Sequence, residues 1–238
     1  MVSFRYPNLI ITTASLAFIH TLAGPDHYLP FIVISKARNW KLGKTIWFTA
    51  LCGLGHVGSS VLLGFFGVAL GITLGKLQFW DGMRGSIVSW IFLAFGLIYM
   101  VWGIRCAIRN KPHTHIHYHP DGHSHEHEHT HHNEHTHIHK KKEKENITPW
   151  ILFTIFIFGP CEPLIPIVMY PAAKNDYSSL LLITLVFCTI TIVMMIVLVT
   201  TASFGFKFLP MKNTERYSHA LAGVTIFVCG MGMVFLCL

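Results

Sequence analysis

Two histidines and an aspartate lie inside a strongly apolar stretch, FIHTLAGPDHYLPF at residues 18–31. In an unbroken helix, His20 and His27 would be about 10 Å apart. One metal ion could not hold both side chains, because its imidazole and carboxylate ligands lie about 2 Å away. The Gly24-Pro25 pair lies between the histidines, and it removes a backbone donor and allows conformations that other residues avoid. We therefore expect the helix to break at this pair and to bring His20, Asp26 and His27 together.

A second stretch, GPCEPLIPIVM at 159–169, resembles GPDHYLPFIVI at 24–34. Each has Gly-Pro, two ligand-type side chains and then Leu and Pro before an aliphatic run, and the second pair is Cys161 and Glu162. A carboxylate in an apolar span costs about 2.5–3.5 kcal/mol on insertion scales. A simple proline kink would not require such side chains, so we expect the two interruptions to line one cavity.

His56 lies in a third apolar stretch, CGLGHVGSS at 52–60, whose glycines allow a neighbouring helix to come close. Taken alone, His56 is equally well explained as a polar residue hydrogen-bonded between helices. Imidazole, thiolate and carboxylate together suit nickel, cobalt or zinc rather than magnesium or calcium. The predicted metal ligands are His20, Asp26, His27, His56, Cys161 and Glu162.

A histidine-rich segment at 113–139 contains thirteen of the 17 histidines. It has too little apolar surface to fold alone, so we expect it to be disordered. Neutral imidazoles bind borderline divalent ions, and metal capture is favoured over a solvated linker or a pH-responsive brush. The predicted capture residues are His113, His115, His117, His119, His123, His125, His127, His129, His131, His132, His135, His137 and His139.

The composition is that of a membrane protein, with 52% hydrophobic and 12% charged residues among 238. Apolar stretches long enough to cross the hydrocarbon predict six spans. They lie at 9–35, 44–75, 85–108, 148–173, 178–203 and 216–238. No C-x-x-C pair is present, and the six cysteines do not form a disulfide framework.

The predicted fold is all-α, with six transmembrane helices as two inverted three-helix repeats and breaks in helices 1 and 4. The repeats are 1–108 and 148–238, joined by the disordered connection 109–147. Basic residues gather after the first, third and fifth spans, which predicts a cytoplasmic connection and both termini outward. The lipid bilayer is therefore one expected partner. Nucleic acid is excluded, because no folded basic surface is expected.

These motifs, HTLAGPDH, GLGH, GPCEPLIP and the histidine-rich connection, resemble the bacterial nickel/cobalt permeases grouped with the LysE-type exporters. The resemblance covers most of the chain and implies that Asp26, His27 and His56 handle the ion. It leaves open whether His20 and Cys161 are ligands, since five residues separate His20 from Asp26 where members of the family typically have four. It also implies the bacterial inner membrane.

The sequence thus predicts a multi-pass transporter of Ni²⁺ or Co²⁺ with no catalysis and no prosthetic group, and efflux is favoured over import. Zn²⁺ transport and metal import are alternatives, as is a metal sensor or buffer. A further alternative is a membrane thiol-disulfide electron carrier. A distant relative uses one cysteine in each of spans one and four, whereas here Asp26 stands at the position equivalent to Cys161, so the sequence disfavours a dithiol relay. The sequence leaves the oligomeric state open, a homo-oligomer included.

Overall fold

The computed structural model describes residues 7–109, 113–118, 124–129, 147–159, 161, 163–205 and 215–236. Apart from one hairpin, the elements in these ranges are helices. They are α1 Pro7–Ala23, the 3-10 helix η1 Pro25–His27, α2 Leu29–Ala37, α3 Leu42–Ala69, α4 Leu74–Arg109, β1 His113–Tyr118, β2 Ser124–His129, α5 Thr148–Phe158, α6 Leu164–Ala173, α7 Tyr177–Gly205, the 3-10 helix η3 Glu215–Tyr217 and α8 Ser218–Leu236.

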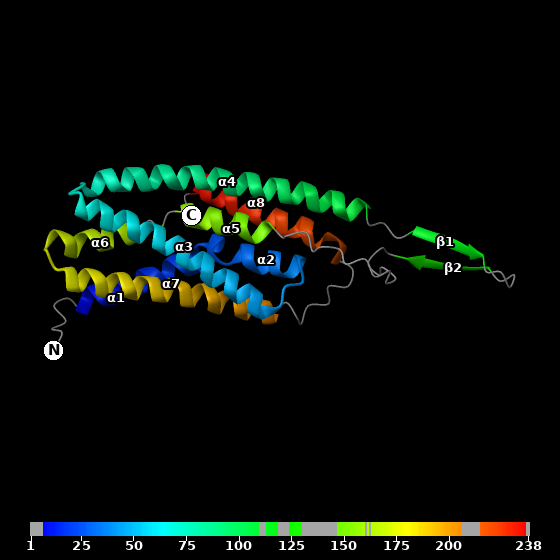
Figure 1. Cartoon of the computed structure of the whole chain (residues 1–238), viewed down its shortest axis with the longest axis horizontal. Coiled ribbons are helices and arrows are strands. Elements are labelled where there is room, and N and C mark those ends of the chain that lie inside the picture. Colours follow the sequence, from blue (N-terminus) through cyan, green and yellow to red (C-terminus); the bar gives the residue numbers. More distant parts are fainter. Residues whose placement is uncertain are drawn as a thin grey trace.

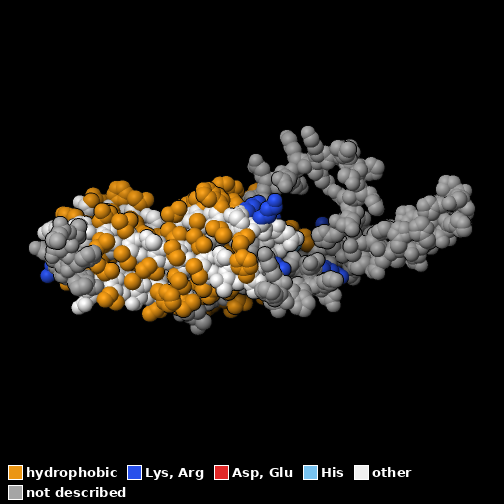
Figure 2. Space-filling model, turned by 90° about the horizontal axis from the view of Figure 1, so that it is seen from below, with side chains coloured by type: hydrophobic (Ala, Val, Ile, Leu, Met, Phe, Trp, Pro, Cys, Tyr) orange, Lys and Arg blue, Asp and Glu red, His pale blue; other side chains and the backbone are white. Residues whose placement is uncertain are grey.

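Figure 1 shows an elongated bundle whose helices run close to its long axis, with the hairpin extending from one end. Four helices, α3, α4, α7 and α8, are long and apolar enough to cross a membrane. Helices α1, α5 and α6 are apolar but shorter. Large apolar side chains such as Trp47, Leu54 and Phe66 are exposed around the bundle, and Figure 2 shows one such face. This surface is the one that lipid requires.

The helix breaks occur where the sequence predicts them. Helix α1 ends at Ala23 and α2 begins at Leu29, while α5 ends at Phe158 and α6 begins at Leu164. Residues 160 and 162, in the second interruption, lie outside the described residues. The predicted second span ends earlier than expected, at Ala69, because Gly71 has a φ of +64° and starts the turn into α4.

Helices α4 and α8 lie backbone against backbone along their length. A Cβ added at Gly96 or Gly103 would meet the backbone of α8, and one at Gly223 or Gly230 would meet the backbone of α4. Small residues allow this approach in membranes, where van der Waals packing replaces the hydrophobic effect as the driving force. The two helices therefore form one rigid wall.

The remaining helices pack around α3 and α7. Helix α3 contacts α5 and α7, and α7 also contacts α1 and α6. A large apolar core includes Phe31, Phe92, Phe156, Met195 and Ile226, from five different helices. Cys52 of α3 belongs to the same core and lies about one helical turn before His56.

The prediction of disorder for the histidine-rich connection differs from the structure over two segments. Strands β1 and β2 pair antiparallel, with His113 opposite His129 and Tyr118 opposite Ser124. Histidines at every second position on both sides of a Pro-Asp-Gly sequence are a signal for a hairpin. The prediction of disorder depended instead on the low apolar content of the segment. The rest of the connection lies outside the described residues.

Candidate functional site

The first interruption begins with an extended glycine. Gly24 has φ −87° and ψ 94°, and Pro25–His27 then form the single turn of η1. The His27 backbone N–H donates to the Gly24 carbonyl at 3.1 Å. A Cβ at Gly24 would lie 2.5 Å from His27 Nδ1 and 2.9 Å from Asp26 Oδ1, so only glycine fits here. The interruption turns the chain so that His27 points back toward α1.

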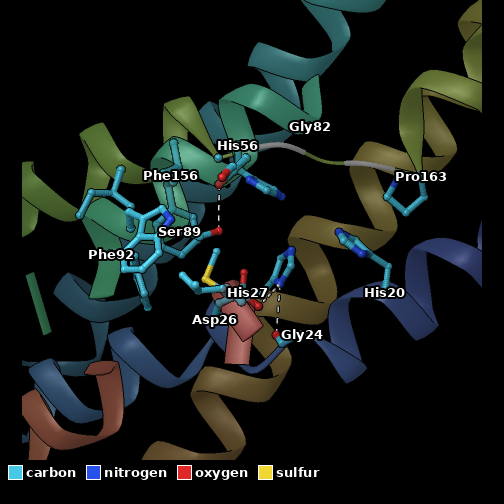
Figure 3. A pocket seen from close by; sticks show the side chains of 18 of the residues that line it. His20, Gly24, Asp26, His27, His56, Gly82, Ser89, Phe92, Phe156 and Pro163 are labelled. Carbon is cyan, nitrogen blue, oxygen red and sulfur yellow. Dashed lines mark hydrogen bonds and ion pairs between the residues drawn. The ribbon is translucent and has the colours of Figure 1, made fainter. Parts of the chain in front are cut away.

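Three imidazoles then meet in the bundle. The ring centroids of His20 and His27 lie 4.7 Å apart and those of His27 and His56 5.0 Å apart. One ligand nitrogen from each of the three lies within 4.8 Å of the others. Figure 3 shows the three rings facing a common space from α1, η1 and α3. The side chains of His27 and His56 are buried, and His20 is partly exposed.

The hydrogen bonds of His27 fix its tautomer. Its Nδ1 lies 3.1 Å from the carbonyl oxygen of Gly24 and 3.2 Å from Asp26 Oδ1. A carbonyl and a carboxylate only accept, so Nδ1 carries a proton, and in the neutral imidazole Nε2 keeps its lone pair. Among the described residues, Nε2 of His27 and Nε2 of His56 are buried without a hydrogen-bond partner. Asp26 therefore fixes the orientation and tautomer of His27, as a carboxylate does when it accepts a hydrogen bond from a metal-binding histidine.

The second interruption brings a thiol to the same place. Cys161 is fully buried, and its Sγ lies 3.7 Å from His20 Nε2. Its backbone N–H donates to Ser60 Oγ at 3.0 Å. Cys161 also belongs to an apolar cluster against which the partly buried Cys188 of α7 packs. Cys161 thus contacts one of the imidazoles and shares its apolar cluster with a second cysteine.

A series of hydrogen-bonded side chains that holds this thiol was not predicted from the sequence. Arg84 donates to Ser60 Oγ at 2.8 Å and to Asp81 Oδ1 at 2.6 Å, and Asp81 is buried in α4. The available signal was a carboxylate in an apolar stretch with an arginine three residues later, which share a helix face. The chain Asp81, Arg84, Ser60, Cys161 ties α4 and α3 to the second interruption.

A cavity of about 400 Å³ lies beside the imidazoles. His20, Asp26, His27 and His56 line it, together with small residues of α4 such as Gly82 and Ser89 (Figure 3). Small side chains at these positions leave room for a solvated ion or for part of a partner.

The structure brings together four of the six predicted ligands, His20, Asp26, His27 and His56, although Asp26 reaches the others through its bond to His27. Cys161 contacts His20 and lies outside the group of three nitrogens. Glu162 lies outside the described residues, as do the side chains of the histidine-rich segment.

The apolar surface, the helix lengths and the buried polar interruptions define a multi-pass membrane protein. The chain belongs to the family described as cytochrome C biogenesis protein transmembrane region, whose family model matches residues 29–232. No curated protein and no solved structure matches the chain.

The family match corrects the sequence analysis. The matched family is one of thiol-disulfide electron carriers, so the assignment to the nickel/cobalt permeases is wrong, and with it nickel or cobalt transport and efflux. The resemblance depended on short polar motifs, and HTLAGPDH at 20–27 lies before the matched residues. Such motifs report the chemistry of a site, which families of different function can share.

Proposed function

We propose that this protein carries reducing equivalents through the membrane by thiol-disulfide exchange, with Cys161 as one of the reacting thiols. Membership of the family carries the proposal. Cys161 supports it, because this thiol lies at a helix interruption beside a polar cavity wall and not on an uninterrupted helix face.

Cys188 is the proposed partner thiol. The first interruption offers Asp26 where a second cysteine would stand by analogy with the repeat, so the partner must come from another element. Of the five described cysteines, Cys188 is the one that packs against the same cluster as Cys161. The pair would therefore join the second interruption to α7.

The electron balance of the exchange is simple. A dithiol protein on one side of the membrane forms its own disulfide and gives two electrons and two protons to a Cys161–Cys188 disulfide, which opens to two thiols. Those thiols then reduce a disulfide protein on the other side and close again. Because Cys161 is fully buried, each exchange requires the helices around the interruptions to open, alternately toward the two sides.

Proteoliposomes test this function. The full chain is reconstituted with the aromatic disulfide dithiobis(nitrobenzoate) trapped inside and reduced thioredoxin added outside. Wild type should release thiol chromophore inside the vesicles, while Cys161→Ser and Cys188→Ser should fall to the level of empty liposomes. Cys106→Ser is the matched control, since Cys106 is a partly buried cysteine of α4 outside the apolar clusters. Transfer that persists in Cys161→Ser, or is absent from wild type, would overturn the proposal.

A second function is supported by the three imidazoles, namely binding of a d-block ion such as Zn²⁺. Two unpartnered buried nitrogens, His27 Nε2 and His56 Nε2, favour it. An unused buried lone pair costs free energy that a bound ion would offset. The histidine-rich segment would supply ions to the site, and the hairpin register places His115 opposite His127 and His117 opposite His125.

Calorimetry with Zn²⁺ on the full chain in detergent tests the metal site. We expect a micromolar dissociation constant, which corresponds to a binding free energy of about 8 kcal/mol in favour of the complex. His27→Gln should weaken binding by more than the roughly 10- to 100-fold loss typical of an outer-shell change. His219→Gln is the matched control, because His219 bonds to the Tyr99 hydroxyl away from the site. Equal loss in both variants would show that the three imidazoles do not form the site.

The arrangement of the spans completes the proposal. We propose that α1 with α2, and α5 with α6, each cross the bilayer as one broken span, so that six spans form two inverted repeats. The distribution of basic residues supports outward termini, a cytoplasmic connection and residence in an inner membrane.

A further inference from the structure

His20 contacts both the residues proposed to bind a metal ion and the thiol proposed to exchange disulfides. Its imidazole is one of the three whose ligand nitrogens lie within 4.8 Å of one another. Its Nε2 is also the atom that lies 3.7 Å from Cys161 Sγ. The thiol and the imidazole group are thus adjacent, although Cys161 and His20 are far apart in the sequence.

The distance between them suits a shared ion. Two ligands on one tetrahedral zinc, a nitrogen at about 2.0 Å and a sulfur at about 2.3 Å, lie about 3.5 Å apart. The observed separation of 3.7 Å between His20 Nε2 and Cys161 Sγ is close to that value. The three nitrogens need to approach further, since two of them on one zinc lie about 3.3 Å apart. Cys161 is therefore at ligand distance from one of the three imidazoles, and it would supply the fourth ligand once its sulfur approaches the other two.

We propose that a metal ion held by His20, His27 and His56 and a disulfide at Cys161 exclude each other, so that metal binding switches the thiol carrier off. This inference rests on the proposed thiol-disulfide function. It makes the three-imidazole site a regulatory site of that function.

The exclusion follows from the chemistry of one sulfur atom. As the fourth ligand, Cys161 gives its proton to water and its lone pair to the ion, so that it no longer attacks a disulfide. As half of a disulfide with Cys188, the same sulfur carries no thiolate charge and leaves the ion with three imidazoles. The two electrons released on closing that disulfide go to an acceptor disulfide protein, as in the exchange proposed above.

The packing around Cys161 favours a choice between these two states. The Ser60 hydroxyl holds its backbone N–H, and Arg84 and Asp81 hold Ser60 in turn. The Cys161 sulfur lies beside His20 of α1, and Cys188 of α7 packs against the same apolar cluster as Cys161. The switch would then combine a rotation of the Cys161 side chain with an approach of Cys188 when the helices around the interruption open.

The experiment uses the wild-type full chain in detergent, so that no variant need fold. Reduced protein is incubated with Zn²⁺ or with a chelator and then treated with the thiol oxidant diamide, which takes up the two electrons and two protons that the closing thiols release. The Cys161–Cys188 disulfide is then measured by mass spectrometry after alkylation. We expect Zn²⁺ to lower the yield of this disulfide roughly tenfold and to slow alkylation of Cys161. Alkylation of Cys106 in the same sample should not change. In the reverse direction, protein already oxidised should bind Zn²⁺ roughly tenfold more weakly in calorimetry.

The outcomes separate this inference from the function on which it rests. Zn²⁺ binding with an unchanged disulfide yield would overturn the switch and leave the carrier function standing. Absence of Zn²⁺ binding would also overturn the switch alone. Absence of a Cys161–Cys188 disulfide with and without the chelator would overturn the thiol function itself.

Discussion

At the scale of single residues, the site depends on how one histidine is held. Nδ1 of His27 is hydrogen-bonded to the Gly24 carbonyl oxygen and to Asp26 Oδ1. These two bonds orient the ring so that its other nitrogen is directed toward His20 and His56. Asp26 keeps a small exposed fraction, 16% of its side chain, toward the cavity. The carboxylate therefore both orients the imidazole and gives the pocket a negative charge that attracts cations.

We predict that Asp26→Asn weakens Zn²⁺ binding by roughly 10- to 100-fold without abolishing it, because the ligands remain and only their support is lost. Calorimetry of the variant beside wild type and His27→Gln measures the effect. The three affinities should fall in the order wild type, Asp26→Asn, His27→Gln. An Asp26→Asn protein that binds as tightly as wild type would show that Asp26 does not support the ligand.

At the scale of elements, glycines decide which helices touch. Along the contact of α4 and α8, a Cβ at Gly230 would lie 2.7 Å from the Cα and 2.8 Å from the backbone N of Leu93. Backbone cannot give way as a flexible side chain can. In contrast, a Cβ at Gly82, which belongs to α4 whereas Gly230 belongs to α8, would have nothing within 4 Å. The two glycines therefore have different roles although both belong to apolar helices.

We predict that Gly230→Ala lowers the free energy of unfolding by about 1–3 kcal/mol through overpacking against α4. Gly82→Ala, the matched control, should keep or raise stability by up to about 1 kcal/mol, since alanine favours a helix more than glycine does. Thermal unfolding in detergent followed by circular dichroism compares them. Equal effects would mean that the close contact of α4 and α8 does not limit the stability of the bundle.

The polar chain from α4 to the second interruption makes another prediction. Asp81→Ala would leave Arg84 without its carboxylate in an apolar setting, and breaking a buried pair costs about 3–5 kcal/mol. Because Arg84 is partly exposed, we expect the lower end of that range. Lys76→Ala, at an exposed position of α4, is the control and should change stability little. Alkylation of Cys161 in Asp81→Ala should also be faster than in wild type, as Ser60 loses its anchor.

At the scale of the whole molecule, the proposed arrangement of spans makes a prediction about sidedness. If α1 with α2 and α5 with α6 are single broken spans, both termini lie on the outer face and the connection 109–147 lies in the cytoplasm. Alkaline phosphatase fused after residue 238 should then be active, and fused within 130–139 it should be inactive. Activity at both positions would contradict the six-span arrangement and would leave the geometry of the imidazoles unchanged.

The family match covers only some of the residues that form the site. The matched residues start at 29, after His20, Asp26 and His27, and they include His56 and Cys161. The whole molecule therefore combines a thiol that lies within the matched residues with an imidazole group of which two members, His20 and His27, precede them. This combination is the basis of the proposed switch.

The sequence by itself determined the membrane class, the two helix interruptions and most of the residues that meet in the site. Composition and Gly-Pro pairs act locally, so they can be interpreted without knowing which helices are neighbours. Only the tertiary structure decided that Cys161 contacts His20, that Asp81 and Arg84 hold Ser60, and that α4 and α8 touch through glycines. These contacts join residues far apart in the chain, and their existence depends on how the helices pack. The short motifs led to the wrong family for the same reason, because ligand types alone do not report the packing that surrounds them.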